Sequence, residues 1–133
     1  MTVLSCVRSL LESGDARLTA AGVAEALDHL VRVAGADEEE AALDLAELGL
    51  LAGIVVASDL GLAAGRLRAR RYHRSRCAVS MADCIAAEAA RRATTSLATS
   101  DPHLLDLCDR EDVSAIVLTA SDGKRWVPPF PRG

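Results

Sequence analysis

Residues 96–105 read Ser96-Leu97-Ala98-Thr99-Ser100-Asp101-Pro102-His103-Leu104-Leu105, a short apolar run that ends in an acid and passes into a helical pattern. An Asp followed by a Pro is a common helix start, with the Asp as N-cap and the Pro at the first helical position. The same order places a carboxylate at the carboxyl end of a strand, where open α/β sheets bind ligands. This junction therefore predicts an α/β fold and makes Asp101 a candidate for either a cap or a functional site.

Strand and helix patterns alternate along the rest of the chain. Short apolar or β-branched runs predict strands at residues 17–19, 54–56, 96–99 and 115–118, and the run at 54–56 is typical of a buried strand. Apolar residues at helical spacing predict helices at residues 3–12, 21–33, 37–48, 59–73, 80–93 and 102–110. Such alternation indicates a parallel sheet with helices on both faces. We therefore expect one three-layer α/β/α domain over residues 1–133, with an extended or irregular tail from residue 120.

The composition limits the class of protein. Half of the 133 residues are apolar, but the only aromatic residues are Tyr72, Trp126 and Phe130, so Leu, Val, Ile and Ala must fill the core. The net charge of −4 argues against a protein that coats nucleic acid by bulk electrostatics. No signal segment is present, and the longest uncharged apolar stretch is about half of a membrane span. We expect a soluble cytoplasmic protein without membrane contact.

The four cysteines show no metal-binding pattern. They are Cys6, Cys77, Cys84 and Cys108, and no two of them form a C-x-x-C pair or the clustered spacing of a zinc site. We interpret them as small buried hydrophobic residues.

Asp83 is the second candidate acid. The run Ser80-Met81-Ala82-Asp83 fits a capping box, in which the hydroxyl and the carboxylate satisfy each other's backbone donors. On a helical wheel, however, Asp83 shares an arc with alanines, whereas Glu88 lies with two arginines on a different arc. A carboxylate among alanines needs a distant cation or a metal as its partner. Asp83 therefore has a structural and a functional interpretation.

Glu25 gains meaning only together with these two aspartates. By itself it lies on the helical arc of Asp28 and Arg32, as a solvated residue would. Several carboxylates at the mouth of a parallel sheet, without a Cys or His ligand set, favour Mg²⁺ or Mn²⁺. Such an ion can activate water and stabilise the charge that develops on a phosphate. The chemistry indicated is phosphodiester hydrolysis.

A basic segment follows residue 65. It holds six arginines in eleven residues within a chain of acidic balance. The planar guanidinium group can bind two phosphate oxygens at once, although a solvated helix face would look the same. With so few aromatic residues, backbone contact is favoured over base-stacking modules. The candidate RNA-binding residues are Arg70, Arg71, Arg74 and Arg76.

Three segments together resemble the successive acidic motifs of PIN-domain ribonucleases, and most of all VapC-type toxins of toxin–antitoxin pairs. The segments are residues 19–31 around Glu25, residues 79–86 around Asp83 and residues 97–105 around Asp101. Each motif alone is weak, but their order, spacing and element types agree. The resemblance extends from about residue 3 to residue 118.

The resemblance implies a Mg²⁺- or Mn²⁺-dependent endoribonuclease that forms a homodimer and is inhibited by a small antitoxin protein. It also implies that Glu25, Asp83 and Asp101 are catalytic carboxylates at the metal site. Thr99 and Ser100 would lie near enough to orient these carboxylates or a water.

The start of the chain departs from the family pattern. In the family, an N-terminal strand at the centre of the sheet ends in the first catalytic Asp, but only 24 residues precede Glu25 here, and none reads as that strand. Asp15, in a Ser-Gly-Asp turn, is a poor substitute. We expect either a start codon assigned too late, a truncated chain, or a shortened member with impaired catalysis. A separate hypothesis is a non-catalytic α/β binding module that holds a protein partner.

Overall fold

The computed structural model describes residues 16–129. The expected helix at residues 3–12, like Cys6 and Asp15, lies outside the described residues. Over the described part the chain is a mixed α/β protein with five α-helices and a small parallel sheet of two strands. None of the helices described in it is long and apolar enough to cross a membrane.

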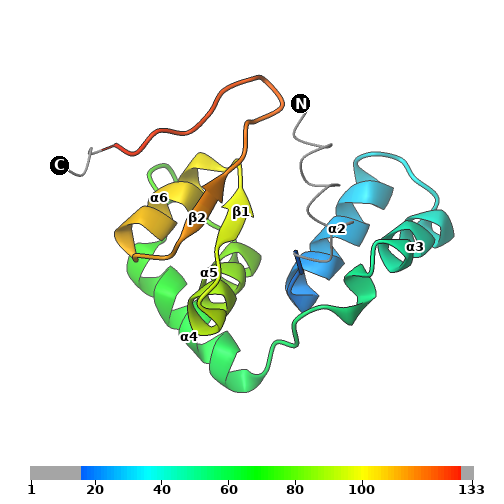
Figure 1. Ribbon diagram of the computed structural model, residues 1–133, viewed down its shortest axis with the longest axis horizontal. Coiled ribbons are helices and arrows are strands. Elements are labelled where there is room, and N and C mark those ends of the chain that lie inside the picture. Colours follow the sequence, from blue (N-terminus) through cyan, green and yellow to red (C-terminus); the bar gives the residue numbers. More distant parts are fainter. Residues whose placement is uncertain (1–15, 130–133) are drawn as a thin grey trace.

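The order of elements follows the expected one (Figure 1). The bounds are α2 (Ala20–Arg32), α3 (Glu38–Glu47), the 3-10 helix η1 (Leu50–Ala52), α4 (Ser58–Arg71), α5 (Met81–Ala93), β1 (Leu97–Thr99), α6 (Pro102–Arg110) and β2 (Ala115–Val117). The helices predicted within this range agree with these bounds to within two residues at each end. Their ends were predictable because local side chains cap them. The N-caps that accept a backbone N–H are Thr19, Asp37, Ser80 and Asp101.

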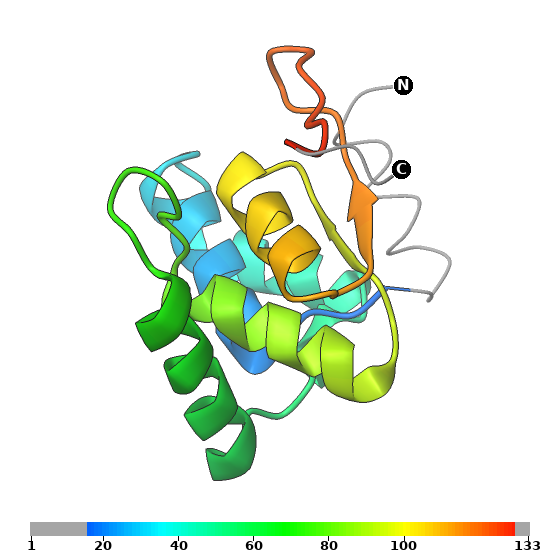
Figure 2. The same cartoon turned by 90° about the vertical axis from the view of Figure 1, so that its left-hand side faces the viewer.

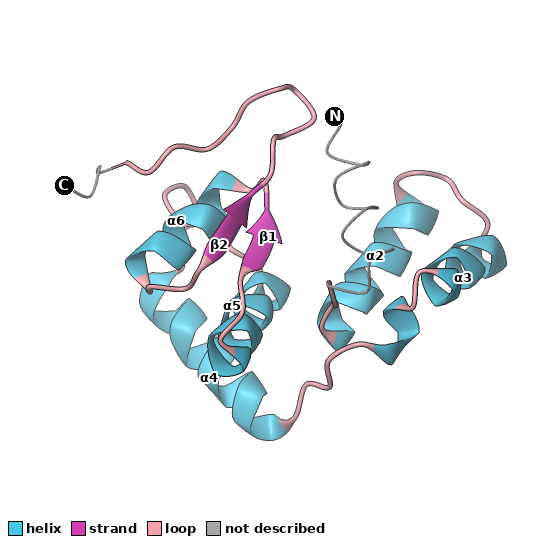
Figure 3. Cartoon of the chain, in the orientation of Figure 1, coloured by secondary structure: helices cyan, strands magenta, loops and turns pink. Residues whose placement is uncertain are grey.

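The two strands form a parallel pair linked by α6 (Figure 3). Ala98 of β1 lies opposite Ile116 of β2, and the pairing continues past the strand ends, where the Leu118 N–H donates to the Thr99 carbonyl over 2.9 Å. In a parallel pair, alternate residues bond to the neighbouring strand, so the N–H and C=O of Ala98 point away from β2. No hydrogen bond to them is made within residues 16–129, so this edge of β1 is open in the described part of the chain.

The pair buries only one of its faces. Leu97 is buried, whereas the paired Ala98 and Ile116 on the opposite face are exposed, as the alternation of side chains in strands requires. Figure 2 shows α4, α5 and α6 on the same side of β2. The described residues therefore show helices on one face of this pair, and the expected three-layer arrangement is not confirmed.

The other two expected strands are reduced to one contact. Residues 17–19 and 54–56 meet in a single parallel bridge between Thr19 and Ile54, in which the Ile54 N–H donates to the Leu18 carbonyl over 2.8 Å. The expectation of a buried strand at residues 54–56 was wrong, because Val55 is 77% exposed. β-Branched residues favour a strand only where a pleated surface covers them. No described strand continues the pairing beyond this bridge.

The main core lies between α4, α5, α6 and the sheet. Leu67 of α4 and Leu107 of α6 are completely buried, and the alanines Ala64 and Ala87 at buried positions let α4 and α5 approach closely. Leu97 of β1 closes this core from the sheet side. The alanine-rich composition thus produces the close helix packing that was expected.

Helices α2 and α3 form a second group of elements beside this core (Figure 1). Helix α2 contacts both α3 and α5, yet it has no buried residue, and its apolar Leu27 and Leu30 are only half-buried. The acids at the start of α3 are exposed, and Asp37 caps the helix by accepting the Glu40 N–H. The run of glutamates is thus a solvated first turn, where the helix dipole favours negative charge.

The cysteine interpretation is confirmed at the three described positions. Cys77, Cys84 and Cys108 are buried and free. Burial raises the pKa of the Cys84 and Cys108 thiols to about 11 and also raises the pKa of Cys77. These side chains therefore act as hydrophobic residues of the core.

One carboxylate connects three helices. Glu111, the C-cap of α6, accepts hydrogen bonds from Arg70 and Arg71 of α4, each 2.9 Å from a carboxylate oxygen, and its backbone carbonyl accepts from Arg91 of α5 over 3.0 Å. Burial alone would raise the pKa of the Glu111 carboxyl, but the hydrogen bonds from Arg71 and Arg70 hold it below its ordinary value. The ion pairs of Glu111 thus fix how α4, α5 and α6 meet.

Alkylation of the native chain tests the cysteine environment. At pH 8 a thiol with a pKa of about 11 is only about one thousandth thiolate, so Cys84 and Cys108 should react slowly with iodoacetamide. Peptide mass spectrometry should find both unmodified in the native protein and fully modified after unfolding in urea. Rapid labelling of either residue in the native protein would contradict its burial.

Replacement of Glu111 tests the three-helix connection. Glu111→Gln should lower the free energy of unfolding at pH 7 by about 1–2 kcal/mol, because three arginines lose a charged acceptor. The folded-state pKa is depressed, so this stabilisation is present above the ordinary pKa of 4.5 and is lost as the pH falls through the lower folded value. Urea denaturation from pH 7 to pH 3 should therefore show the two proteins converging in acid. As a control, Asp28→Asn, which breaks the exposed pair with Arg32, should have a much smaller effect.

Candidate functional site

Asp101 occupies the expected junction between β1 and α6. One carboxylate oxygen, Oδ1, accepts the His103 N–H over 2.9 Å, and Pro102 follows at the first helical position, so the residue is a helix N-cap. The Asp101 N–H donates to the Thr99 hydroxyl over 3.1 Å. These contacts hold Asp101 at the carboxyl end of a parallel strand. The second carboxylate oxygen, Oδ2, has no hydrogen-bond partner in the described part of the chain.

Asp83 is held in the capping box that the sequence indicated. The Ser80 N–H donates to Oδ2 of Asp83 over 2.9 Å, and the Asp83 N–H donates to the Ser80 hydroxyl over 3.0 Å. The residue is half-buried, next to the buried Cys84. Here too one carboxylate oxygen, Oδ1, forms no hydrogen bond with any described residue. Asp83 therefore takes part in the capping box and leaves its Oδ1 available to a ligand.

The helical wheel correctly indicated that Asp83 is away from the solvated face of α5, but it did not indicate the burial of Glu88. Glu88 is 8% exposed, although its arc of the helix was grouped with two arginines. Its carboxylate lies 3.5 Å from Arg91, three residues later on the same helix, which compensates the charge on a partly covered surface. The packing of α4 against α5 covers a wider arc of α5 than the alanines alone indicated.

Glu25 is not brought together with the two aspartates. It is exposed on α2, and its position near the ion pair of Asp28 with Arg32 matches the solvated face that the wheel indicated. No three His, Cys, Asp or Glu side chains within residues 16–129 are grouped as a metal site. Of the two expected supporting residues, Thr99 accepts the Asp101 N–H through its hydroxyl, and Ser100 is half-buried beside it.

The donor chemistry of the two aspartates still fits a hard cation. Mg²⁺ is commonly bound through one or two carboxylates, with waters and substrate phosphates in the remaining positions. Asp83 and Asp101 each offer an oxygen of this kind from a side chain that a cap holds in place.

The four candidate RNA-binding arginines divide into two pairs. Arg70 and Arg71 are held by the carboxylate of Glu111, so their guanidinium groups already have an anionic partner. Arg74 and Arg76 are exposed, and neither forms an ion pair with any described residue. The structure therefore assigns Arg70 and Arg71 a structural contact and leaves Arg74 and Arg76 available to a ligand.

The segment between α4 and α5, residues 72–80, carries these two residues and is called the arginine loop below. The N–H and C=O groups of His73 and Cys77 pair across it in an antiparallel bridge. Inside this turn, Nδ1 of His73 accepts the N–H groups of Ser75 and Arg76 over 3.2 and 3.1 Å. Cys77 is also buried. The loop is thus an ordered turn, although its tip is exposed.

The arginine loop is joined to the start of α6. The Ala78 N–H donates to Nδ1 of His103 over 3.2 Å, and the His103 N–H in turn donates to Asp101. The basic loop is therefore two hydrogen bonds from the candidate carboxylate. This connection joins segments 25 residues apart in the sequence.

Comparisons of the chain with protein-family models, curated proteins and solved structures give no match.

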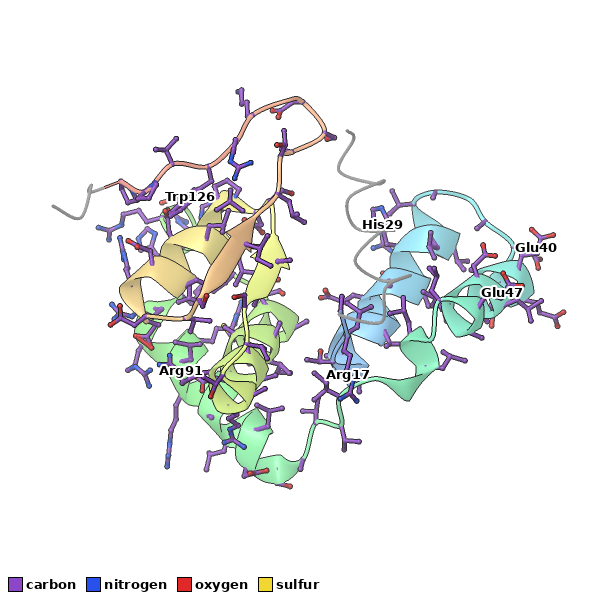
Figure 4. The ribbon with its side chains drawn as sticks, viewed as in Figure 1. Arg17, His29, Glu40, Glu47, Arg91 and Trp126 are labelled. Atoms are coloured by element: carbon purple, nitrogen blue, oxygen red, sulfur yellow. The ribbon has the colours of Figure 1, made fainter. Side chains whose placement is uncertain are left out.

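Other side chains at this end of the molecule had no expected role. His73 and His103 order and anchor the arginine loop, and Trp126 donates to Asp106 of α6 over 2.8 Å, which ties down the tail (Figure 4). The sequence could have drawn attention to His103, because this residue follows Asp101 closely at the predicted start of a helix. The contacts of Trp126 join residues distant in sequence, and no local pattern could reveal them.

Removal of the serine hydroxyl tests the capping box. Ser80→Ala should lower the free energy of unfolding by about 1 kcal/mol, because the Asp83 N–H loses its acceptor. Urea denaturation gives this value. A matched control is Ser58→Ala, since Ser58 starts α4 without a side-chain cap and should change stability little. Equal effects of the two changes would contradict the cap.

Proposed function

We propose that the chain is a metal-dependent endoribonuclease of the PIN-domain type, similar to VapC toxins, that cleaves RNA phosphodiester bonds. The observation that carries the proposal is the hydrogen bond from Ala78 to His103. It joins a loop with two unpaired arginines to the residue that donates its N–H to Asp101. Groups that bind phosphate and a carboxylate at a strand end are thereby connected, as cleavage of a phosphodiester requires.

In this proposal Asp83 and Asp101 hold a Mg²⁺ or Mn²⁺ ion, without the exposed Glu25. The bound ion supplies water activation and stabilisation of charge on the phosphate. The protein's own contribution is to hold the two aspartates rigidly through their caps. Thr99 and Ser100 position the Asp101 end of β1, and the arginine loop holds the RNA backbone beside it.

The proposed fold is the three-layer PIN arrangement, with a central strand that joins the two parallel contacts. The open edge of β1 at Ala98 supports this, because its N–H and C=O lack a partner within the described residues. The Thr19–Ile54 bridge is also parallel and stands apart from the sheet. A strand between the two would pair with both.

The proposed partners are a small antitoxin protein and a second copy of the chain, in the cytoplasm. Exposed apolar side chains support a protein partner, since Leu51 and Val55 are 60% and 77% exposed. They line an open groove of about 410 Å³ together with neighbouring apolar residues of α2 and the bridge segment. A groove of this kind fits the apolar side of a partner segment.

A non-catalytic binding module, or a shortened domain with impaired catalysis, is the second candidate. The observation that favours it is that each of the three acids has a structural explanation. Asp83 and Asp101 cap helices, and Glu25 is solvent-exposed. Such a protein would bind its partner through the same apolar groove without cleaving RNA.

Conversion of the aspartates to asparagine separates capping from catalysis. In Asp101→Asn the side chain still caps α6, and in Asp83→Asn the amide oxygen can still accept the Ser80 N–H, but both changes remove the charge that a metal requires. Cleavage of a fluorogenic RNA by the wild type should need Mg²⁺ or Mn²⁺. Asp83→Asn and Asp101→Asn should each lower the rate at least about 100-fold while the unfolding midpoint changes little.

The control is Asp44→Asn, which removes the same charge from an exposed position on α3 and should leave cleavage unchanged. Cleavage that persists in both site variants, or that needs no metal, would contradict the proposed mechanism. A folded wild type that cleaves no RNA would favour the binding module.

A further inference from the structure

Tyr72 is the one aromatic residue beside the available arginines. It is the C-cap of α4, and its N–H donates to the Arg68 carbonyl over 2.8 Å, so the main chain leaves the helix at this residue. The residue is 46% exposed, so that a large aromatic group is accessible at the end of α4. Its position at the start of the arginine loop places it two residues before Arg74.

Arg68 fixes the orientation of the Tyr72 ring. The guanidinium carbon lies 4.2 Å from the centroid of the ring, in a cation–π contact. The same guanidinium donates to the Val79 carbonyl over 3.0 Å, and Val79 is buried. Arg68 therefore contacts Tyr72 at the start of the arginine loop and Val79 near its end. Its guanidinium group covers one face of the Tyr72 ring. The ring is pre-oriented, with much of its surface in solvent.

Phosphate-binding groups lie close to this ring along the chain. Arg74 and Arg76 are exposed at the tip of the turn, and His73 orders the backbone between them. No acid occurs between residues 60 and 82. The arginine loop itself therefore carries positive charge and no carboxylate.

We propose that Tyr72 is a platform on which an unpaired nucleobase stacks while Arg74 and Arg76 bind the adjacent phosphates, so that the platform strengthens the binding of a single strand and not of a duplex. The inference rests on the proposed ribonuclease function and names the residues that hold the RNA strand. It also changes the sequence-based expectation of backbone contact alone.

The physical reason for this selectivity is access to the base. In an RNA duplex the bases are stacked on each other, and a protein meets mainly phosphates and 2′-hydroxyl groups. In a single strand a base can leave its neighbours and lie on an aromatic ring, with little preference for sequence. A guanidinium on the far face of the ring strengthens such a platform, as Arg68 does here.

Fluorescence anisotropy with a labelled 12-nucleotide single-stranded RNA, and with its duplex, tests the inference. EDTA is present throughout, so that binding is measured without cleavage. Tyr72→Leu keeps an apolar side chain but no aromatic face, and it should weaken single-strand binding at least about tenfold. Duplex binding should change less than twofold. Tyr72→Phe should bind both ligands like the wild type.

The arginines should behave differently from the tyrosine. Arg74→Ala and Arg76→Ala should each weaken binding of both ligands by a similar factor. The salt dependence of single-strand binding should fall by about 0.7 in slope for each phosphate contact that is lost. Arg32→Ala, which removes the same charge from α2, is the matched control and should have no effect on either ligand.

The outcome that would overturn the inference is an equal effect of Tyr72→Leu on single strand and duplex, or no effect on either. A DNA strand of the same sequence is a further arm. Equal or weaker binding of DNA agrees with the proposal, whereas tighter binding of DNA than RNA contradicts it. Circular dichroism and the unfolding midpoint report whether each variant is folded. If Tyr72→Leu does not fold, Tyr72→Phe and Tyr72→Trp decide, because the larger ring of Trp should strengthen single-strand binding.

Failure of this inference can be told apart from failure of the proposed function. Asp44→Asn should bind single-stranded RNA like the wild type, because this exposed carboxylate of α3 belongs neither to the stacking platform nor to the candidate metal residues. If RNA binding depends on Tyr72 but no metal-dependent cleavage occurs, only the proposed ribonuclease function is contradicted. Metal-dependent cleavage with single-strand binding that does not depend on Tyr72 would contradict the stacking platform alone.

Discussion

The ion pairs of Glu111 determine both the packing of the helices and which arginines remain for a ligand. A half-buried carboxylate cannot stand alone, and Arg70 and Arg71 of α4 with Arg91 of α5 neutralise it. The same contacts bring the ends of α4, α5 and α6 together, so the arginine loop between α4 and α5 starts from a fixed point. Glu111 thus gives two of the six arginines in the basic segment a structural contact, and Arg74 and Arg76 stay available. This explains how a segment can look uniformly basic in sequence and still act through only a few of its residues.

The helices could be predicted from the sequence because their ends depend on neighbours in the chain. Thr19, Ser80 and Asp101 each accept a backbone N–H from two or three residues ahead, and these motifs are visible without any tertiary structure. The role of Glu111 and the burial of Glu88 could not be predicted, because both depend on how separate helices meet. In the candidate site the caps at Asp83 and Asp101 were foreseen as alternatives to function. The histidine contacts that join the arginine loop to Asp101 were not, since they depend on loop geometry.

The strands could not be predicted from local sequence in the same way. An apolar run formed a strand only where a partner strand exists. The runs that became β1 and β2 face a covering layer of helices, whereas residues 54–56 pair at one position and expose Val55. An isolated parallel contact gains too few hydrogen bonds to order a strand. The open edge at Ala98 and the incomplete burial of α2 have the same origin, because the described residues supply no third strand between them. The sheet is therefore the part of the fold that local sequence determines least.

Capping and catalysis are compatible uses of one carboxylate, and this matters for how the candidate site is interpreted. A cap consumes one oxygen of Asp83 and one of Asp101, and it fixes each side chain without closing the second oxygen. A flexible acid would lose conformational entropy on binding a cation, whereas a capped acid has already lost it when the protein folds. The caps therefore do not argue against a metal site at these residues. They provide the rigidity that such a site needs, and the hydrogen bond from Ala78 to His103 anchors the arginine loop to the residue that donates its N–H to Asp101.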